Sequence, residues 1–329
     1  MVHRFSISSS HSGTESCYGL PMRLCFGSAV CVLALSLTPL GHGEEPDDSR
    51  ILQRILGTRE QILKTSAGTN LAGPAVFLAV WDFDGTILKG DSSEGLKEGD
   101  RTVYRGLIQV AIENGLSELY PRDGGFARFW TDYTNMDMRI GHWLAYPFIP
   151  QMLRGAPADD VLQLSKAYFS STLSNYLMAS SVKIIRALER GGVESYIISA
   201  GAGLFVKGAA KSLGIPASHI NGIELRTRDG RLTEELIYPV PWNVGKRERL
   251  KQIMAEIEHE PSGRKVFVLA GFGDSYHTDG PFLKFIATQH LPAGQPLAVF
   301  YGESAEPAEY AGLFYQARHS ATVSDRPRP

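Results

Sequence analysis

The sequence predicts an α/β protein with a doubly wound, Rossmann-like parallel sheet and an inserted helical domain. Three short apolar runs, at residues 75–81, 193–198 and 265–270, have the form of strands buried on both faces. Each run ends in polar or glycine residues, and a helical pattern follows it. Strands that alternate with helices form a parallel sheet with helices on both of its faces.

Residues 1–43 contain the pattern of a secretory signal peptide. Met22-Arg23 starts an apolar stretch, Leu24 to Leu40, which ends at Gly41-His42-Gly43. A basic start, an apolar middle and small residues before a cut are typical of export signals. We therefore expect a periplasmic or secreted protein. We interpret residues 1–21, which are polar and Ser-rich, as a mis-annotated extension before the true start at Met22.

An uncleaved membrane anchor is the alternative interpretation of this stretch. The stretch contains Pro39 and falls short of the ~20 residues that a membrane-spanning helix needs. We therefore expect no stable membrane association of the mature chain.

Composition excludes several classes of protein. All three cysteines lie in the predicted signal, at Cys17, Cys25 and Cys31. The mature chain therefore has no disulfide framework, cysteine-ligated metal site or cysteine nucleophile. The formal net charge is −2 and no basic run occurs, so we expect no nucleic-acid partner. A content of 43% hydrophobic and 21% charged residues excludes a disordered chain.

The remaining elements follow from periodicity. Apolar residues at helical spacing predict a helix over residues 48–66, before the strand at 75–81. The long, aromatic-rich segment 90–179 exceeds a helix crossover, so we predict an inserted helical cap between the two parts of the core, 44–89 and 180–318. Further expected elements are a strand over 297–301, helices over 204–213, 282–288 and 307–317, a hairpin over 223–237 turning at Asp229-Gly230, and a disordered tail over 319–329.

Polar side chains follow three of the predicted strands at their carboxyl ends. Asp82 and Asp84 follow the first strand, Ser199 follows the second, and Asp274 follows the third. In doubly wound sheets the ligand site lies at this edge. Two neighbouring buried carboxylates need a compensating cation, and with Asp274 they form an oxygen-rich cluster suited to Mg²⁺.

Two further features fit a phosphate group. Lys246 starts a helix and can neutralise a phosphoryl group as a point charge. Ser199, Ala200 and Gly201 form a predicted turn whose hydroxyl and N–H groups can hold phosphate oxygens. Taken singly, Ser199 is also typical of a helix cap and Lys246 of a solvated lysine.

These motifs, in this order, resemble the four-motif signature of the haloacid dehalogenase-like superfamily over residues 75 to about 301. The resemblance implies that Asp82 is the nucleophile and that Asp84 is the general acid and base. It implies that Mg²⁺ is held by Asp82, Asp274 and the backbone carbonyl of Asp84, and that Ser199 and Lys246 bind the transferring group. The supporting phosphate-site residues are Gly85, Thr86, Ala200, Gly201, Ser275 and Asp279.

The second carboxylate decides the expected chemistry within the superfamily. Dehalogenase members lack an acid at the position of Asp84, so its presence implies a phosphatase that acts through an aspartyl-phosphate. The alternatives are a phosphotransferase or phosphomutase of the same superfamily, and a non-catalytic periplasmic binding protein.

A closer resemblance is to bacterial phosphorylcholine phosphatases and phosphoserine phosphatases. Its signs are the Gly-Asp-x-x-x-x-Asp-Gly form of the last motif, Trp242 to Lys246, and Tyr146-Pro147-Phe148 with Gly155. The superfamily resemblance implies that Asp279 orients Lys246 or a metal-bound water. Asp279 lies five residues after Asp274 instead of the usual four, and this spacing leaves the choice between the two roles open.

This closer resemblance implies a small phosphate ester with an ammonium group. Candidate ammonium-binding residues are Asp91, Glu94, Trp130, Tyr133, Trp143 and Tyr146. Carboxylates attract an ammonium, and aromatic faces add cation–π contacts. The alternatives are a helix cap and first-turn acid for Asp91 and Glu94, and cap core for the aromatic residues. We interpret His277 as an incidental loop histidine, and the sequence leaves the oligomeric state open.

Overall fold

The computed structural model describes residues 47–66, 74–261, 263–319 and 321–325. The predicted signal peptide lies outside the described residues. Within them, every helix is too short or too polar to cross a membrane.

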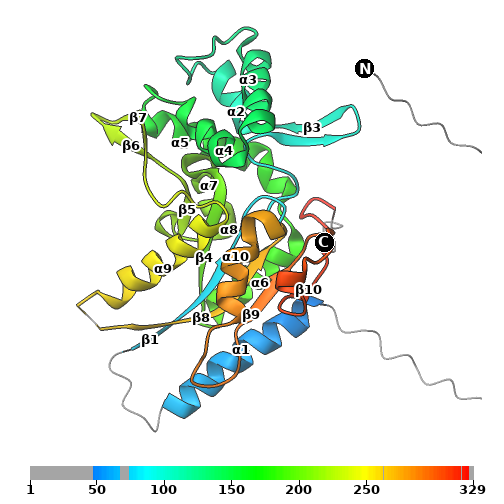
Figure 1. The fold of residues 1–329 in the computed structure, drawn as a ribbon, viewed down its shortest axis with the longest axis vertical. Helices are drawn as coiled ribbons and strands as arrows, with labels where there is room; N and C mark the ends of the chain where they lie inside the picture. The colour runs from blue at the N-terminus through cyan, green and yellow to red at the C-terminus, as the bar shows by residue number, and fades with distance from the viewer. Residues whose placement is uncertain (1–46, 67–73, 262, 320, 326–329) are drawn as a thin grey trace, which may run out of the picture. The chain divides into compact units, whose positions relative to one another are not determined.

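The centre of the fold is a six-stranded parallel sheet with the strand order β10-β9-β8-β1-β4-β5 (Figure 1). Its strands are β1 (Ala75–Trp81), β4 (Glu194–Ala202), β5 (Ile220–Ile223), β8 (Lys265–Gly273), β9 (Leu297–Phe300) and β10 (Tyr315–Gln316). The strands that follow β1 in the sequence lie on both sides of it, β4 on one side and β8 on the other. The connections therefore leave β1 in opposite directions, and this arrangement creates a crevice at the carboxyl end of β1. The predicted fold class is confirmed.

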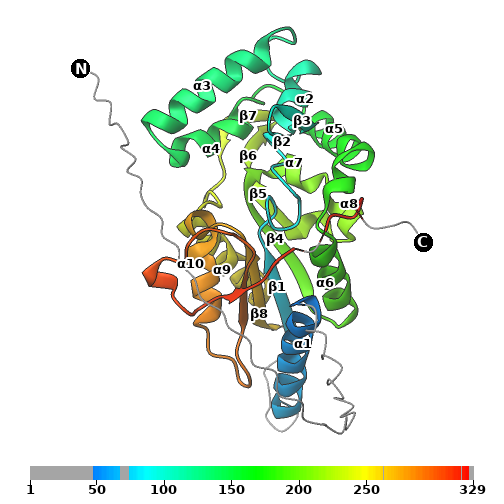
Figure 2. The same cartoon turned by 90° about the vertical axis from the view of Figure 1, so that its right-hand side faces the viewer.

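Alternate residues of β1 pack into two separate cores on the two faces of the sheet. Phe77, Ala79 and Trp81 belong to the core under α1 (Asp47–Ser66) and α6 (Ala179–Arg190). The intervening residues of β1 belong to the core under α9 (Val244–Glu258) and α10 (Tyr276–Ala287). Figure 2 shows these helix pairs on opposite sides of the strands. Burial on both faces explains the unbroken apolar run of β1.

The segment between β1 and β4 is mostly helical, as predicted, but it begins with a hairpin. The helices are α2 (Leu107–Glu113), α3 (Gly125–Arg139), α4 (His142–Gln151), α5 (Ala158–Ser171) and the short η1 (Leu173–Tyr176). The hairpin joins β2 (Gly95–Glu98) to β3 (Arg101–Arg105). The sequence analysis did not predict this hairpin, and its signal was the two-residue Gly99-Asp100 turn, in which Gly99 has a φ of +59°.

Other elements differ in extent from the sequence prediction. The hairpin of β6 (Leu225–Arg228) and β7 (Arg231–Leu236) turns at Asp229-Gly230, as predicted. The expected helix over 204–213 is divided into α7 (Gly203–Lys207) and α8 (Ala210–Leu213), and η2 (Ala217–His219) follows. The expected helix over 307–317 is wrong, because only the short η3 (Ala308–Tyr310) forms there. Gly312, with a φ of +70°, then turns the chain into β10.

The predicted disorder of the tail is wrong for residues 319 and 321–325. The backbone N–H of Ala179 donates to Ala321, at 3.0 Å, and that of Val323 donates to Leu177, at 2.8 Å. The His319 ring stacks on Tyr301 with 3.9 Å between the ring centroids. Pairing with the segment that precedes α6 satisfies backbone groups of this polar tail, and composition alone carries no sign of it.

We predict that ending the chain after Arg318 destabilises the fold. Three backbone hydrogen bonds, at Ala321, Val323 and Ser324, and the His319 stacking are lost, at about 1 kcal/mol for each hydrogen bond. Urea unfolding should therefore show a loss of about 3 kcal/mol. A chain that ends at Asp325 keeps all of these contacts and is the control. Equal stability of the two truncated chains would contradict this role of the tail.

Candidate active site

The site starts where β1 ends. Asp82 is 5% exposed, and its backbone N–H donates to Phe272 of β8 at 2.8 Å. Gly85 then turns the chain with a φ of +78°, and a Cβ at this position would lie 2.0 Å from Asp274 Oδ2. Glycine therefore allows the first and last motifs to approach each other, and Thr86 Oγ donates to Asp82 Oδ2 at 3.1 Å.

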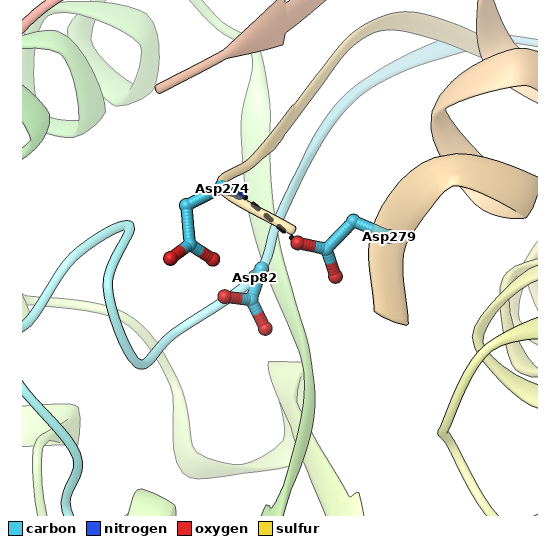
Figure 3. Close-up of side chains that lie close together, drawn as sticks. All are labelled: Asp82, Asp274 and Asp279. Atoms are coloured by element: carbon cyan, nitrogen blue, oxygen red, sulfur yellow. Dashed lines mark hydrogen bonds between the residues drawn. The ribbon is translucent and has the colours of Figure 1, made fainter. Parts of the chain in front are cut away.

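Three carboxylates from different elements meet at this end of the sheet. Oxygen atoms of Asp82, Asp274 and Asp279 all lie within 4.8 Å of one another (Figure 3). The backbone N–H groups of Asp274 and Ser275 donate to Asp279 Oδ2, at 3.0 and 3.1 Å. Ser275 also caps α10 by accepting a hydrogen bond from the backbone of Thr278.

Lys246 is the cation at the centre of this cluster. Its side chain is 0% exposed, and Nζ lies 2.5 Å from Asp82 Oδ1 and 2.6 Å from Asp279 Oδ1. Burial lowers the pKa of Lys246, but Asp279 and Asp82 outweigh burial and raise it, so the group is an ammonium. Asn243 caps the helix that carries Lys246, with a left-handed φ of 52°.

The cluster holds more negative than positive charge. Within the described residues, no ion pair joins Asp274 to a cation, and burial, Asp82 and Asp279 raise the pKa of Asp274 to about 8. Burial and Asp279 raise the pKa of Asp82 to about 6 against the opposing effect of Lys246. Oxygen atoms of Asp82, Asp274 and Asp279 together fit a divalent cation with oxygen ligands, and Asp274 is the member of this cluster that Lys246 does not neutralise.

Asp84 lines the same cavity as Lys246. Its Oδ1 accepts a hydrogen bond from the Ser92 backbone at 2.6 Å, and its Oδ2 accepts one from the Ser92 hydroxyl at 3.2 Å. Burial, Asp91 and Asp82 raise the pKa of Asp84 well above its usual range, which favours the protonated acid. The sequence analysis missed Ser92; its only signal was the polar run Asp91-Ser92-Ser93-Glu94.

Ser199 reaches the same edge from β4. This strand continues through Ala202 with an irregularity after Ile198, so the predicted turn at residues 199–201 is part of the strand. The Ser199 hydroxyl accepts a hydrogen bond from the Gly201 backbone at 2.9 Å. A Cβ at Gly201 would lie 3.2 Å from Asp84 Oδ2, so the close approach of β4 to the loop after β1 favours glycine.

These groups line one cavity with a volume of about 190 Å³. Its inner wall holds Asp82, Asp84, Ser199, Lys246 and Asp274, with Ala200, Gly201 and Ser275 beside them. Its outer wall holds Asp91, Glu94, Tyr133 and Tyr146. Sequence reasoning missed the lining residues Ser93, Ile149 and Thr278.

Comparisons with known proteins agree with this arrangement. A protein-family model described as haloacid dehalogenase-like hydrolase matches residues 79–284. The chain belongs to this family. The predicted resemblance is confirmed, and no curated protein matches the hydrolase.

Solved structures resemble the hydrolase at low identity. A protein of unknown function from Bordetella pertussis Tohama I is 18% identical with a TM-score of 0.51, over 69% of this chain and 90% of its own. A functionally unknown protein from Anaerococcus prevotii DSM 20548 is 14% identical with a TM-score of 0.51, over 79% of this chain and 90% of its own. These likenesses support the fold of the hydrolase.

Four of the six predicted ammonium-binding residues lie together in the hydrolase. Asp91 Oδ1 accepts hydrogen bonds from the backbones of Ser93 and Glu94, at 2.7 and 2.8 Å, in a loop and not at a helix start. The Tyr133 hydroxyl donates to Glu94 Oε1 at 2.9 Å, and Tyr146 lines the cavity beside them. Burial and Asp91 raise the pKa of Glu94 to about 7.

The other two predicted residues, Trp130 and Trp143, do not line this cavity. The Trp143 side chain is 60% exposed, and its Nε1 donates to the carbonyl of Ile140 at 3.0 Å. Trp130 packs beside Phe126, with 6.2 Å between the ring centroids. Helical spacing alone could not tell which face of α3 or α4 meets the cavity.

The prediction for His277 is also corrected. His277 lies in the first turn of α10, and its ring is 5.5 Å from the rings of both His142 and Trp242. It therefore belongs to an aromatic contact between α4 and the core and is not an isolated loop residue.

We predict that Mg²⁺ stabilises the chelator-treated hydrolase through Asp274. A ligand at 100 times its Kd that binds only the folded state adds about 2.7 kcal/mol to the free energy of unfolding. Urea unfolding at pH 8 should show this gain for the native sequence, and Asp274→Asn should lose most of it. Asp100→Asn, at an exposed hairpin position, should keep it. Equal stabilisation of Asp274→Asn would contradict the assignment of Asp274 as a ligand.

Proposed function

We propose that the hydrolase is an exported, Mg²⁺-dependent phosphomonoesterase that acts on a small, amine-bearing phosphate ester such as phosphorylcholine or phosphoserine. One observation carries the proposal. Asp82 accepts a hydrogen bond from the Lys246 ammonium and lines the same cavity as Asp84, whose raised pKa favours its acid form. A charged nucleophile and a separate proton donor are what the cleavage of a phosphate ester needs.

The reaction proceeds in two steps. In the first, Asp82 attacks phosphorus, the bond to the ester oxygen breaks, and Asp84 gives its proton to the leaving alcohol. In the second, the ionised Asp84 takes a proton from water, which attacks phosphorus, releases phosphate and frees Asp82. Lys246 and the Ser199 hydroxyl face the transferring group from the inner wall of the cavity.

Asp82 and Asp274 are the side chains that would hold Mg²⁺. When bound, Mg²⁺ supplies positive charge against the phosphoryl oxygens and the two carboxylates. Asp279 is left to position Lys246, since its Oδ1 lies 2.6 Å from Nζ and its Oδ2 accepts two backbone hydrogen bonds.

The outer wall supports an ammonium on the leaving group. Asp91 and Glu94 form no ion pair with a cation within the part of the chain that the structure describes, and both side chains line the cavity. An ammonium beside them compensates their charge, and the rings of Tyr133 and Tyr146 offer cation–π contacts. The volume of about 190 Å³ suits a small substrate.

Export remains part of the proposal on the strength of residues 22–43. The basic start, the apolar stretch and the small residues that follow it are typical of a secretory signal. A catalyst whose nucleophile is a carboxylate is also unaffected by an oxidising compartment. Cell fractionation of the expressed full chain, with N-terminal sequencing of the product, tests this part.

We predict that Asp82→Asn abolishes turnover. The amide cannot form the aspartyl-phosphate, so phosphate release from para-nitrophenyl phosphate and phosphorylcholine with Mg²⁺ should fall at least about 10³-fold, a loss of about 4 kcal/mol of transition-state stabilisation. Asp100→Asn is the matched control and should keep full activity. Undiminished activity of a folded Asp82→Asn protein would sink the mechanism, and product analysis with added alcohols separates hydrolysis from phosphotransfer.

We predict that recognition of the ammonium depends on pH through Glu94. The relevant quantity is kcat/KM for phosphorylcholine divided by kcat/KM for 3,3-dimethylbutyl phosphate, its uncharged isostere. Because the pKa of Glu94 is raised to about 7, its carboxylate forms only as the pH rises through 7. The ratio should therefore rise about tenfold between pH 6 and pH 8, which is about 1.4 kcal/mol.

The control for this prediction is Glu94→Gln, which keeps the size of the side chain and removes its charge. Its ratio should stay low across the same pH range. The titration of phosphate affects both esters and cancels in the ratio. A ratio that is flat in the native protein, or that rises equally in Glu94→Gln, would rule out Glu94 as the ammonium partner.

A further inference from the structure

A second cavity adjoins the catalytic one, and Glu94 lines both. It has a volume of about 270 Å³ and lies between the hairpin β2–β3, the helix α2 and the first half of α3. Figure 1 and Figure 2 show these elements together at one end of the described chain. The side chain of Glu94 is therefore shared between the linings of the two cavities.

The apolar wall of the second cavity consists of aromatic rings. Phe126 and Trp130 line it, and their ring centroids are 6.2 Å apart. Trp130 also lies 5.7 Å from the ring of Tyr133, whose hydroxyl donates to Glu94. An aromatic surface therefore runs from the catalytic cavity past Glu94 into the second cavity.

The hairpin adds two cationic side chains to the lining of this cavity. Lys97 and Arg105 of the hairpin line it. Arg105 is neutralised by Glu113, with 2.5 Å between the charged atoms. Lys97 forms no ion pair with any described carboxylate, although its neighbours Lys89 and Arg101 both pair with Glu98. One uncompensated cation therefore lies in this cavity, opposite in charge to Glu94.

The hairpin that carries Lys97 is held firmly at its base. The Tyr104 hydroxyl donates to the carbonyl of Lys89 at 2.6 Å, and the Tyr104 side chain is only 4% exposed. Gly95 has a φ of +99°, and a Cβ there would lie 2.6 Å from the backbone nitrogen of Gly106. The strands β2 and β3 therefore keep a fixed place beside Glu94.

We propose that this second cavity is a subsite for the far end of the leaving group. It takes a flat or hydrocarbon segment against Trp130 and Phe126 and an anionic end at Lys97. The substrate class is accordingly a zwitterionic amino-alcohol monophosphate. Its phosphate lies at Asp82, its ammonium at Asp91 and Glu94, and its anionic end in the second cavity at Lys97. This inference rests on the proposed phosphatase function.

Three synthetic esters test the subsite. The first is phosphorylcholine. In the second, a benzyl group replaces one N-methyl group of phosphorylcholine, and in the third that group is 4-carboxybenzyl. All three place the same phosphate and ammonium in the catalytic cavity and differ only in what extends beyond Glu94. The native protein should show the highest kcat/KM for the carboxybenzyl ester, about tenfold above that for phosphorylcholine.

Single substitutions distinguish the contribution of Lys97 from that of the aromatic residues. Lys97→Ala should lower kcat/KM for the carboxybenzyl ester about fivefold and leave the other two esters unchanged. Trp130→Leu should lower kcat/KM for both benzyl esters about tenfold more than it lowers kcat/KM for phosphorylcholine. Arg101→Ala removes a cation of the same hairpin that pairs with Glu98 and does not line the cavity, so it should change nothing.

The outcomes distinguish this inference from the proposed function. If phosphorylcholine is hydrolysed but the extended esters gain nothing, or if Lys97→Ala affects all three esters alike, the subsite is refuted and the phosphatase stands. If none of the three esters nor para-nitrophenyl phosphate is hydrolysed, the proposed function is refuted. Lys97 is an exposed hairpin residue, so its variant does not depend on Trp130→Leu folding well.

Discussion

The ion pairs of Lys246 are the interaction on which the rest of the site depends. One fully buried ammonium joins Asp82 at the end of β1 to Asp279 in the first turn of α10, while Lys246 itself comes from α9. Three segments far apart in the sequence are thus tied at one atom. Loss of the cation would leave two buried carboxylates unpaired, which typically costs about 3–5 kcal/mol. The same contact that positions the proposed nucleophile therefore also ties the end of β1 to the helices α9 and α10.

This arrangement leaves the cavity with more carboxylates than cations. Uncompensated carboxylates lie both beside Asp82 and around Glu94. Lys246 compensates Asp82 and Asp279 but not Asp274, which leaves an oxygen site that suits a divalent cation. At the other end Asp91 and Glu94 lack a cationic partner among the described residues. Asp84 lies between the two ends, where burial and the neighbouring acids favour its neutral form. The proposed metal ion, the protonation of Asp84 and the proposed ammonium of the substrate thus each compensate part of the same excess of negative charge.

The sequence predicted the inner wall of the site better than the outer wall, and the reason is physical. Residues at the ends of parallel strands must meet at one edge, so the places of Asp82, Ser199 and Asp274 followed from the apolar runs before them. The outer wall depends on which face of each helix turns inward, which spacing does not determine. Trp143 points to solvent for this reason. Ser92 and the tail residues act through local and backbone hydrogen bonds that composition does not reveal.

In the proposed subsite, the hairpin β2–β3 acts on the choice of substrate and not on the chemistry. Glu94 immediately precedes β2, so the strand that begins at Gly95 carries the chain away from the ammonium site and along a second cavity. The proposed nucleophile Asp82, the proposed acid Asp84 and Lys246 all lie outside the hairpin, and the hydrogen bonds that hold them do not include it. Substitutions in the hairpin can therefore alter which leaving group is accepted while the bond-breaking groups keep their places. An insertion at this point of the chain accordingly changes specificity at little cost to the mechanism.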